Sequence, residues 1–244
     1  MQVVATALRV LEEVITGQPL GVSELARRTR MPKSTVQRAL LTLADEGWIQ
    51  PDPEGSKTWI QTPKILALAS RGRGAGIRDI AMPVMKKLLE AVNENVHLTV
   101  RQNDDVVVLD KVDSSHPVRV FDPLGTTIPL HASASGKAIL AWSGDDSIED
   151  YLNHRLATHF TADTITDPDS LRTELEHIRE SGYSYNRGEW RSEIKGIAAP
   201  IHEKHGTPRF AVSLSIPDHR LPETKVPELA ALVKEAARNI AHAL

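Results

Sequence analysis

The part of the sequence that most constrains the fold lies between residues 23 and 49, where two short helices joined by a tight turn are predicted. Ser23 is a favourable N-cap residue, and a helical stretch from Glu24 to Thr29 follows it. Pro32 then marks the turn and opens a second helix, because proline is well tolerated in the first helical turn. The stretch therefore has the order of a helix-turn-helix motif.

The second predicted helix has one apolar face and one polar face. At ~100° per residue, Leu40 and Leu43 each fall within ~40° of Val36 and form a narrow apolar stripe with it. The opposite face carries Ser34, Gln37, Arg38 and Leu41. Short hydrogen-bonding side chains with one arginine suit the reading of base edges in a DNA major groove, and a leucine suits contact with a thymine methyl group.

A basic run and a hairpin pattern accompany these helices. Five basic residues lie within a dozen positions with no acid among them: Arg27, Arg28, Arg30, Lys33 and Arg38. Strand patterns at 48–50 and 57–60, separated by a turn, predict a hairpin wing. The predicted DNA contacts of this winged helix-turn-helix are Ser23, Arg27, Arg28, Lys33, Ser34, Thr35, Gln37, Arg38 and Lys57. The alternatives are a three-helix core with a solvated basic face, or a head used only for dimer or protein contacts.

Length and composition indicate an ordinary globular protein of two domains. The chain has 244 residues, of which 41% are hydrophobic and 25% are charged. Cysteine is absent, and neither an N-terminal signal nor a long apolar run is found, so a cytoplasmic location is expected. Residues 1–76 carry ten Lys/Arg against seven Asp/Glu, a net +3, and the remainder carries nineteen against twenty-five, a net −6. A basic head on an acidic body fits DNA binding at one end.

Helix, turn and glycine patterns divide the chain into three parts. A first helix is expected over residues 2–16, a loop over 17–21 and a short apolar helix over 64–71. Three glycines between residues 71 and 76 are typical of a hinge. The expected parts are a winged helix-turn-helix domain at 1–62, a linker helix and hinge at 63–76, and a second domain at 77–244.

The second domain is expected to mix helices and strands. Helices are expected at 77–95, 135–142, 145–152, 168–181 and from Pro222 or Pro227 to Leu244. Strands are expected at 96–101, 106–112, 118–121, from 182 to 185, at 196–201 and at 209–216, with a loop over 122–131. Hairpins flanked by helices predict an α+β fold with an antiparallel sheet.

Two features of this domain favour a small-ligand pocket. Residues 133–136 lie where a loop enters a helix, so free backbone amides there favour an anion. Ser213 and Ser215 alternate with apolar residues, so both hydroxyls project from one face of the sheet. If that face is internal, a small organic acid is the expected ligand. The alternative is that these serines cap backbone groups or face solvent.

Other motifs fail on spacing, so no enzyme activity, metal or cofactor is expected. Gly136-Lys137-Ala138 lacks the surroundings of a phosphate-binding loop, and residues 202–205 lack the zinc-binding spacing. His97 and His131 are expected to be core histidines with satisfied hydrogen bonds. The rival interpretation is an enzyme domain that acts on a small acid and carries the helical head as an accessory.

Several motifs, in their order and spacing, resemble the IclR family of bacterial transcriptional regulators along almost the whole chain. They are LARR at 25–28 with KSTVQRAL at 33–40, PLHASASGKAILA at 129–141, GY at 182–183, GIAAPI at 196–201 and SLS at 213–215. The resemblance implies a winged helix-turn-helix joined to a GAF-like effector-binding domain. It also implies a homodimer or tetramer that binds a palindromic operator on double-stranded DNA, with an affinity altered by a small metabolite, often a carboxylate.

By position, the resemblance also implies an effector pocket. Its expected residues are Ala134, Ser135, Asn186, Gly196, Ser213 and Ser215, with Trp190 filling or lining the space beside Gly196. Some family members have an acidic residue at the position of Asn186 and a cysteine at that of Gly196, so their ligand does not transfer. Gly196 is expected to leave extra room. The expected function is a ligand-responsive regulator, taken as the repressor of a catabolic operon, with the signal passing through residues 62–76.

Overall fold

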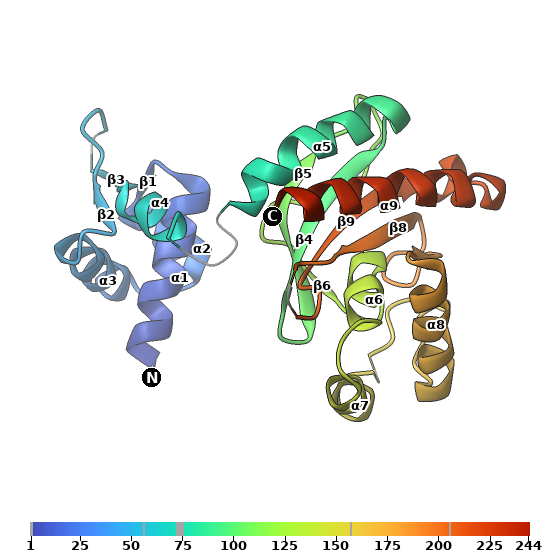
Figure 1. Ribbon diagram of the computed structural model, residues 1–244. Coiled ribbons are helices and arrows are strands. Elements are labelled where there is room, and N and C mark those ends of the chain that lie inside the picture. The colour runs from blue at the N-terminus through green and yellow to red at the C-terminus, as the bar shows by residue number, and fades with distance from the viewer. Residues whose placement is uncertain (1, 56, 72–75, 157, 205) are drawn as a thin grey trace. The chain divides into compact units, whose positions relative to one another are not determined.

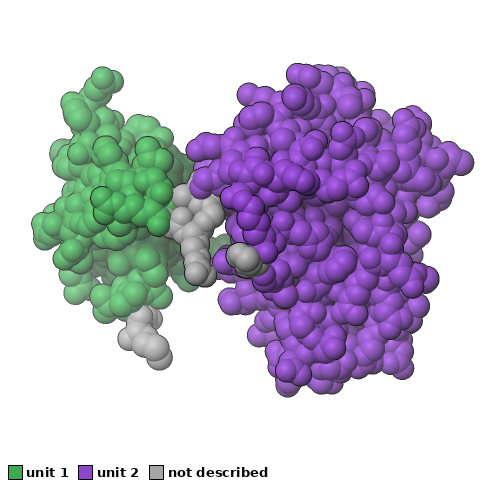
Figure 2. Space-filling view, viewed as in Figure 1, with its two compact units in different colours: residues 1–75 green, residues 76–244 purple. Residues whose placement is uncertain are grey.

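The computed structural model describes residues 2–55, 57–71, 76–156, 158–204 and 206–244. The chain divides into two compact units, residues 1–75 and residues 76–244, which are called unit 1 and unit 2 (Figure 2). Residues 72–75, which make up most of the predicted hinge, lie outside the described residues.

The described residues of unit 1 form a helical core with a small antiparallel sheet. Its elements are α1 (Gln2–Gly17), β1 (Leu20–Gly21), α2 (Val22–Thr29), α3 (Lys33–Asp45), β2 (Ile49–Pro51), β3 (Thr58–Gln61) and α4 (Lys64–Ala69). The strand order is β1-β3-β2, and β2 and β3 form the wing (Figure 1). The winged helix-turn-helix predicted from the sequence is confirmed.

The apolar stripe of α3 anchors the core of unit 1. Val36 and Leu40 are fully buried and Leu43 is nearly so, and they belong to one apolar cluster with Leu25 of α2 and Val14 of α1. Because the faces of an α-helix repeat every ~3.6 residues, burial of this stripe leaves the opposite face of α3 exposed. The predicted inner face of α3 is therefore correct.

The start of α2 differs from the prediction, whereas the start of α3 agrees with it. α2 begins at Val22 rather than Glu24, and its N-cap residue is Gly21 rather than Ser23. The cause is β1, which was expected to be loop but pairs with β3 and leads the chain directly into α2. α3 begins at Lys33, directly after its N-cap residue Pro32, as the sequence predicts.

The described residues of unit 2 form a six-stranded antiparallel sheet with helices on both faces. The helices are α5 (Ile77–Val92), α6 (Ala134–Leu140), α7 (Asp145–His154), α8 (Pro168–Ser181) and α9 (Val226–Ala243), with 3-10 turns at Asp218–Arg220 and Glu223–Lys225. The strands are β4 (Asn95–Gln102), β5 (Asp105–Val112), β6 (Thr127–Pro129), β7 (Ser184–Asn186), β8 (Ile194–Ile201) and β9 (Phe210–Pro217), in the spatial order β6-β5-β4-β9-β8-β7. Helices α5 and α9 cover one face and α6 covers the other (Figure 1), so the predicted α+β fold is confirmed.

Alternation along the central strands gives this sheet two chemically different faces. Val96 and Leu98 of β4 and Leu214 of β9 belong to the apolar core formed with α5 and α9. His97 and Ser213 are paired across β4 and β9, and they face the opposite way because successive side chains alternate along a strand. A polar floor therefore lies under α6.

The segment between β5 and α6 does not follow the prediction. Residues 118–121 are irregular rather than a strand, and the side-chain amide of Asn95 holds them by donating to the Val120 carbonyl at 2.5 Å. Val118 and Phe121 are exposed and only Val120 between them is buried, so the segment has little apolar surface for a strand to pack against the core. The strand β6 forms instead within the predicted loop and pairs with β5.

Candidate functional site

The outward face of α3 carries most of the side chains predicted to read DNA. Ser34, Gln37 and Arg38 are exposed, Thr35 is half-buried and Leu41 is 49% exposed. An α-helix fits the major groove, and exposed hydrogen-bonding side chains on its outer face are the groups that reach base edges. The polar face of α3 therefore has the geometry that base contacts need.

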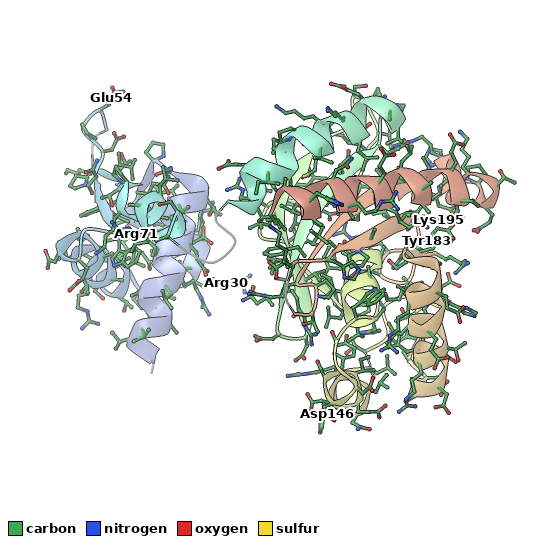
Figure 3. The ribbon with its side chains drawn as sticks, viewed as in Figure 1. Arg30, Glu54, Arg71, Asp146, Tyr183 and Lys195 are labelled. Carbon is green, nitrogen blue, oxygen red and sulfur yellow. The ribbon has the colours of Figure 1, made fainter. Side chains whose placement is uncertain are left out.

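The basic residues around α3 fall into two groups. Glu24 pairs with Arg27 at 2.6 Å and with Arg28 at 2.9 Å, and these hydrogen bonds lower the pKa of Glu24 to about 2. Arg30 (labelled in Figure 3), Lys33, Arg38 and Lys57 are among the basic side chains that make no ion pair with other described residues. The available positive charge therefore lies at the start of α3 and on the wing, whereas the arginines of α2 are already paired.

The wing carries charge of both signs. Glu54 lies at its tip (Figure 3), and exposed Lys57 precedes the returning strand β3. Asp52 holds the turn, because its carboxylate accepts hydrogen bonds from the Glu54 amide at 3.1 Å and the Thr58 hydroxyl at 3.3 Å. A phosphate would be repelled by the acidic tip and attracted by Lys57.

Unit 2 contains a cavity of about 60 Å³ between the polar floor of the sheet and the start of α6. All the predicted effector-binding residues line it: Ala134, Ser135, Asn186, Trp190, Gly196, Ser213 and Ser215. Charged or titratable side chains not assigned to it from the sequence also line it: His97, Asp122, Arg191 and Lys195. A cavity of this size holds about four to six water-sized groups, so it suits a small ligand.

The start of α6 supplies hydrogen-bonding groups to the cavity. Ser133 is the N-cap residue, and its hydroxyl accepts from the Gly136 amide at 3.0 Å. Ser135 donates from its hydroxyl to the Ser213 hydroxyl at 3.0 Å. The backbone amides of Ala134 and Ser135 have no hydrogen-bond partner among the described residues. Free amides at the start of a helix favour a negatively charged or oxygen-bearing ligand group.

Gly196 allows the sheet and α6 to approach closely. A Cβ added at Gly196 would lie 3.2 Å from the Cβ of Ala134 and 3.4 Å from the carbonyl oxygen of Leu214. The extra room expected at this glycine is therefore partly filled by Ala134. A larger residue would press against the helix start, because a packed interior tolerates little added volume.

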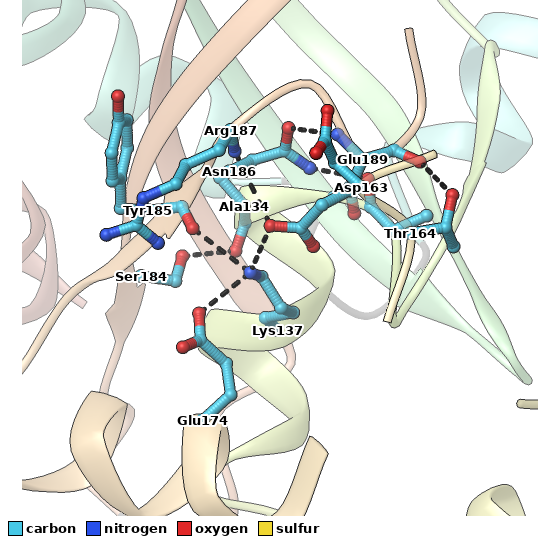
Figure 4. Close-up of polar contacts among 12 residues, drawn as sticks. Ala134, Lys137, Asp163, Thr164, Glu174, Ser184, Tyr185, Asn186, Arg187 and Glu189 are labelled. Carbon is cyan, nitrogen blue, oxygen red and sulfur yellow. Dashed lines mark hydrogen bonds and ion pairs between the residues drawn. The ribbon is translucent and has the colours of Figure 1, made fainter. Parts of the chain in front are cut away.

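Asn186 lines the cavity, but its amide group is already engaged by the protein. Its Oδ1 accepts from the backbone N–H groups of Gly188 at 2.9 Å and Glu189 at 3.1 Å, and its Nδ2 donates to the Ala132 carbonyl at 2.6 Å (Figure 4). These bonds join the turn after β7 to the loop before α6. Asn186 thus shapes the cavity wall, and a ligand would have to share its polar atoms.

A buried lysine fastens residues 187–193, called the lid loop, to α6. The Nζ of Lys137 donates to Glu174 at 2.8 Å, to Glu189 at 2.7 Å and to the Tyr185 carbonyl at 3.0 Å (Figure 4), and its side chain is fully buried. Burial raises the pKa of Glu189, and the charge of Lys137 opposes that rise. No sequence pattern predicts this role for Lys137, because its partners lie 37 to 52 residues away along the chain.

A second ion pair lies at the lining of the cavity. The guanidinium of Arg191, on the lid loop, lies 2.9 Å from the carboxylate of buried Asp122. The same guanidinium lies 3.9 Å from the ring centre of Trp190, a favourable distance for a cation–π contact. The lid loop is therefore tied to the irregular segment after β5 as well as to α6.

The two candidate core histidines differ in how their ring nitrogens are satisfied. His131 has Nδ1 2.6 Å from the Tyr151 hydroxyl, and its Nε2 donates to the Thr158 carbonyl at 2.9 Å. His97 is equally buried, but its Nε2 has no hydrogen-bond partner among the described residues. The expectation of a satisfied core histidine is thus confirmed for His131 and wrong for His97.

The part of the chain that the structure describes holds no group of three His, Cys, Asp or Glu side chains placed to bind a metal ion. No helix in those residues is both long and apolar enough to cross a bilayer. The hydroxyls of Ser133 and Ser135 donate to the Pro129 carbonyl and to Ser213, and no described histidine pairs with them. Neither of these two serines is therefore paired with a base that would activate it as a nucleophile.

Comparison with known proteins assigns both units to one family. The model of the IclR helix-turn-helix domain matches residues 3–53, and the model of the bacterial transcriptional regulator IclR C-terminal region matches residues 72–242. The chain is 32% identical over 235 residues to the HTH-type transcriptional regulator BhcR of Paracoccus denitrificans, covering 96% of this chain and 84% of BhcR. It is 29% identical over 244 residues to the transcriptional repressor IclR of Escherichia coli, covering 98% and 89% of the two chains.

Among solved structures, the fold is similar to that of an IclR homolog from Microbacterium hydrocarbonoxydans complexed with 4-hydroxybenzoate. The TM-score is 0.81 and the sequence identity is 26%, with 98% of each chain covered. The similarity spans both units, as do the two family models. This chain belongs to the IclR family of bacterial transcriptional regulators.

Proposed function

We propose that this protein is a cytoplasmic repressor that binds a palindromic operator as a dimer or tetramer, and that a small organic acid bound in unit 2 changes its operator affinity. The observation that carries the proposal is that one chain combines an exposed hydrogen-bonding face on α3 with a small cavity under α6 that is lined by serine hydroxyls and an asparagine amide. The repressor name of its Escherichia coli relative supports the sign of regulation.

For DNA binding, the outer face of α3 would enter the major groove. Gln37 and Arg38 would reach base edges, while Lys33 at the helix start and Lys57 on the wing would contact phosphates. Two copies of unit 1 in an oligomer would then read two half-sites of the operator. Ser34 and Thr35 complete the contact surface, and Ser23, Arg27 and Arg28 of α2 flank it.

For effector binding, the acid group would take the two free amides of Ala134 and Ser135. The hydroxyls of Ser135, Ser213 and Ser215 would hold its remaining oxygens. The 4-hydroxybenzoate bound to the Microbacterium relative is itself an organic acid, which supports this class of ligand. An effector that binds two arrangements of the protein with different affinity shifts their populations, and operator affinity changes with them.

The test combines calorimetry and gel-shift assays on the full chain. A panel of small carboxylates and their neutral amide analogues is titrated into the protein, and each binder is then added to the operator complex. Carboxylates are expected to bind more tightly than the amides and to change the midpoint of the gel shift. Equal binding of acids and amides would contradict the acid effector, and an unchanged gel shift would contradict the regulatory link.

Whether the bound acid is chemically converted distinguishes the proposed regulator from the rival enzyme. In the proposed function the bound acid is recovered unchanged, because the cavity holds no nucleophile paired with a base among its described residues. Incubation of protein with each binding acid, followed by mass spectrometry of the small molecule, is expected to show no conversion. Turnover of any bound acid would favour the enzyme.

A further inference from the structure

His97 places an unsatisfied polar atom at the floor of the cavity. Its side chain is only 3% exposed and lines the cavity, and its Nε2 has no hydrogen-bond partner among the described residues. A buried polar atom without a partner keeps the full penalty of its desolvation. Most buried polar atoms in proteins are paired, so an unpaired one in a ligand cavity points to a group on the ligand.

The neighbours of His97 do not supply that partner. Asp122 lines the same cavity and its Oδ1 lies 2.9 Å from Arg191, but that oxygen, like His97 Nε2, makes no hydrogen bond with the described residues. Ser213 lies opposite His97 on the neighbouring strand, and its hydroxyl accepts from Ser135. The nearest charged groups belong to Asp122, Lys111, Asp113 and Arg191, with both signs represented. Two residues of the cavity lining therefore each have a buried polar atom without a hydrogen bond among the described residues, His97 at Nε2 and Asp122 at Oδ1.

The position of His97 limits the size of the ligand. Neighbouring strands lie about 4.8 Å apart, so His97 is one strand spacing from Ser213. Ser213 is in turn one hydrogen bond, 3.0 Å, from the Ser135 hydroxyl at the start of α6. A short molecule with one oxygen group on the amides of Ala134 and Ser135 therefore spans the floor to His97. The small volume of the cavity agrees with that length.

The ring nitrogen also limits the chemistry of the ligand. Burial lowers the pKa of His97, so the imidazole is neutral near pH 7 and its Nε2 is either an N–H donor or a bare acceptor. A carboxylate or a keto oxygen satisfies only the donor form, because such oxygens only accept. A hydroxyl satisfies either form, because it donates one hydrogen bond and accepts others.

We infer that the effector is a short hydroxy acid whose carboxylate binds the start of α6 and whose hydroxyl binds His97 Nε2, and that His97 sets the preference for the hydroxyl. This inference rests on the proposed function, since it takes the acid effector as given. It adds the second functional group of the ligand and the residue that selects it. His97 is thereby a specificity residue at the end of the cavity away from α6.

The experiment compares hydroxy acids with acids of the same chain length that lack the hydroxyl. Isothermal titration calorimetry on the full chain measures propionate against lactate and 3-hydroxypropionate, and butyrate against 3-hydroxybutyrate and 4-hydroxybutyrate. At least one hydroxy acid is expected to bind ten-fold or more tightly than its matched acid. In His97→Phe that ratio is expected to fall below about two-fold, because the ring remains and its hydrogen-bonding atoms are gone.

Two further variants support the test: Thr99→Val as a matched control, and His97→Leu as a second substitution of His97. Thr99→Val changes a cavity-lining hydroxyl two residues along β4 that is already directed at the Ala211 carbonyl, so the hydroxyl preference is expected to persist. His97→Leu replaces His97→Phe if the phenyl ring prevents folding. The readout is a ratio of two affinities, so a general loosening of the cavity does not imitate the expected result.

Each contrary outcome contradicts a different claim. If hydroxy acids and plain acids bind the parent equally, the inference is overturned and the acid effector stands. If the hydroxyl preference survives in His97→Phe or His97→Leu, the role of His97 is overturned. If no acid binds at all, both the inference and the acid effector of the proposed function are overturned.

Discussion

The polar side chains on the outer face of α3 are exposed and unbonded, whereas Asn186 and Lys137 beside the cavity of unit 2 are buried and bonded to other protein groups. Ser34, Gln37 and Arg38 point to solvent, and their side chains make no hydrogen bond or ion pair with other described residues. Around the cavity, Asn186 and Lys137 are buried and their polar atoms are bonded to protein groups. Exposed groups contribute little to stability, whereas a broken buried pair is costly. Function and stability should therefore be separable on α3 and coupled around the cavity.

Lys137→Met should give the largest effect and tests the coupling around the cavity. The substitution leaves the carboxylates of Glu174 and Glu189 without their shared cation, and Glu189 is buried. Removing one partner of a buried pair typically destabilises by about 3–5 kcal/mol. Urea denaturation of the full chain should show this loss, and effector affinity should fall as well, because the lid loop loses its attachment to α6.

The matched control is Arg172→Met, which breaks two exposed ion pairs. Arg172 pairs with Glu149 at 2.8 Å and with Asp169 at 2.7 Å on the surface of unit 2, where solvent screens the charges. The unfolding midpoint of the Arg172→Met protein in urea should stay close to that of the parent. If the Lys137→Met protein is as stable as the Arg172→Met protein, the comparison is contradicted. The buried ion pairs of Lys137 would then contribute no more to stability than ion pairs on the surface.

Arg38→Ala tests whether DNA binding and stability are separable on α3. A bidentate arginine–base contact is worth about 1–3 kcal/mol, so operator affinity should fall by about 5-fold to 150-fold for each half-site. The urea midpoint and the effector affinity should stay close to those of the parent, since Arg38 is exposed and lies in unit 1. Lys86→Ala, which removes an exposed basic residue from α5, is the control for loss of positive charge. Equal operator affinity of Arg38→Ala and the parent in a gel-shift assay would remove α3 as the reading surface.

The same contrast explains how far the sequence could predict the two sites. The inner stripe of α3 and the shared face of Ser213 and Ser215 follow from local periodicity, so both were predictable from residue spacing. The bonds that use up the Asn186 amide and the three acceptors of Lys137 depend on segments that meet only in the folded chain. No local pattern distinguishes a satisfied histidine from His97, because the missing partner is a property of the surroundings.

Acidification should destabilise unit 2 through His131. Burial lowers the pKa of His131 below its ordinary value of 6.5, and the hydrogen bond from its Nε2 to the Thr158 carbonyl opposes that fall only in part. Between the folded pKa and 6.5 the unfolded chain binds more protons than the folded chain, so stability falls as pH drops through that range. The slope is at most about 1.4 kcal/mol per pH unit for this one group.

The His131 contribution is isolated by comparing the parent with His131→Phe in urea denaturation at pH 7, 6 and 5. The parent should lose more stability than the variant on acidification, because only the parent has the ring to protonate. Comparing the two proteins cancels the titration of groups common to both, including Glu189, whose raised pKa acts in the opposite direction. Parallel pH profiles would show that burial of His131 carries no proton-linked stability.

Glu24→Gln should have the smallest effect and sharpens the contrast within unit 1. Glu24 occupies Arg27 and Arg28, and with a pKa of about 2 it stays ionised at every working pH. Substitution therefore releases Arg27 and loosens Arg28, which also lies 3.6 Å from Glu13. Operator affinity should rise less than about ten-fold, and each new phosphate contact should steepen the salt dependence by about 0.9 in log–log slope. Glu90→Gln, an equal charge change on α5, should leave both unchanged. Weaker operator binding by Glu24→Gln would instead mean that Glu24 positions the two arginines for DNA.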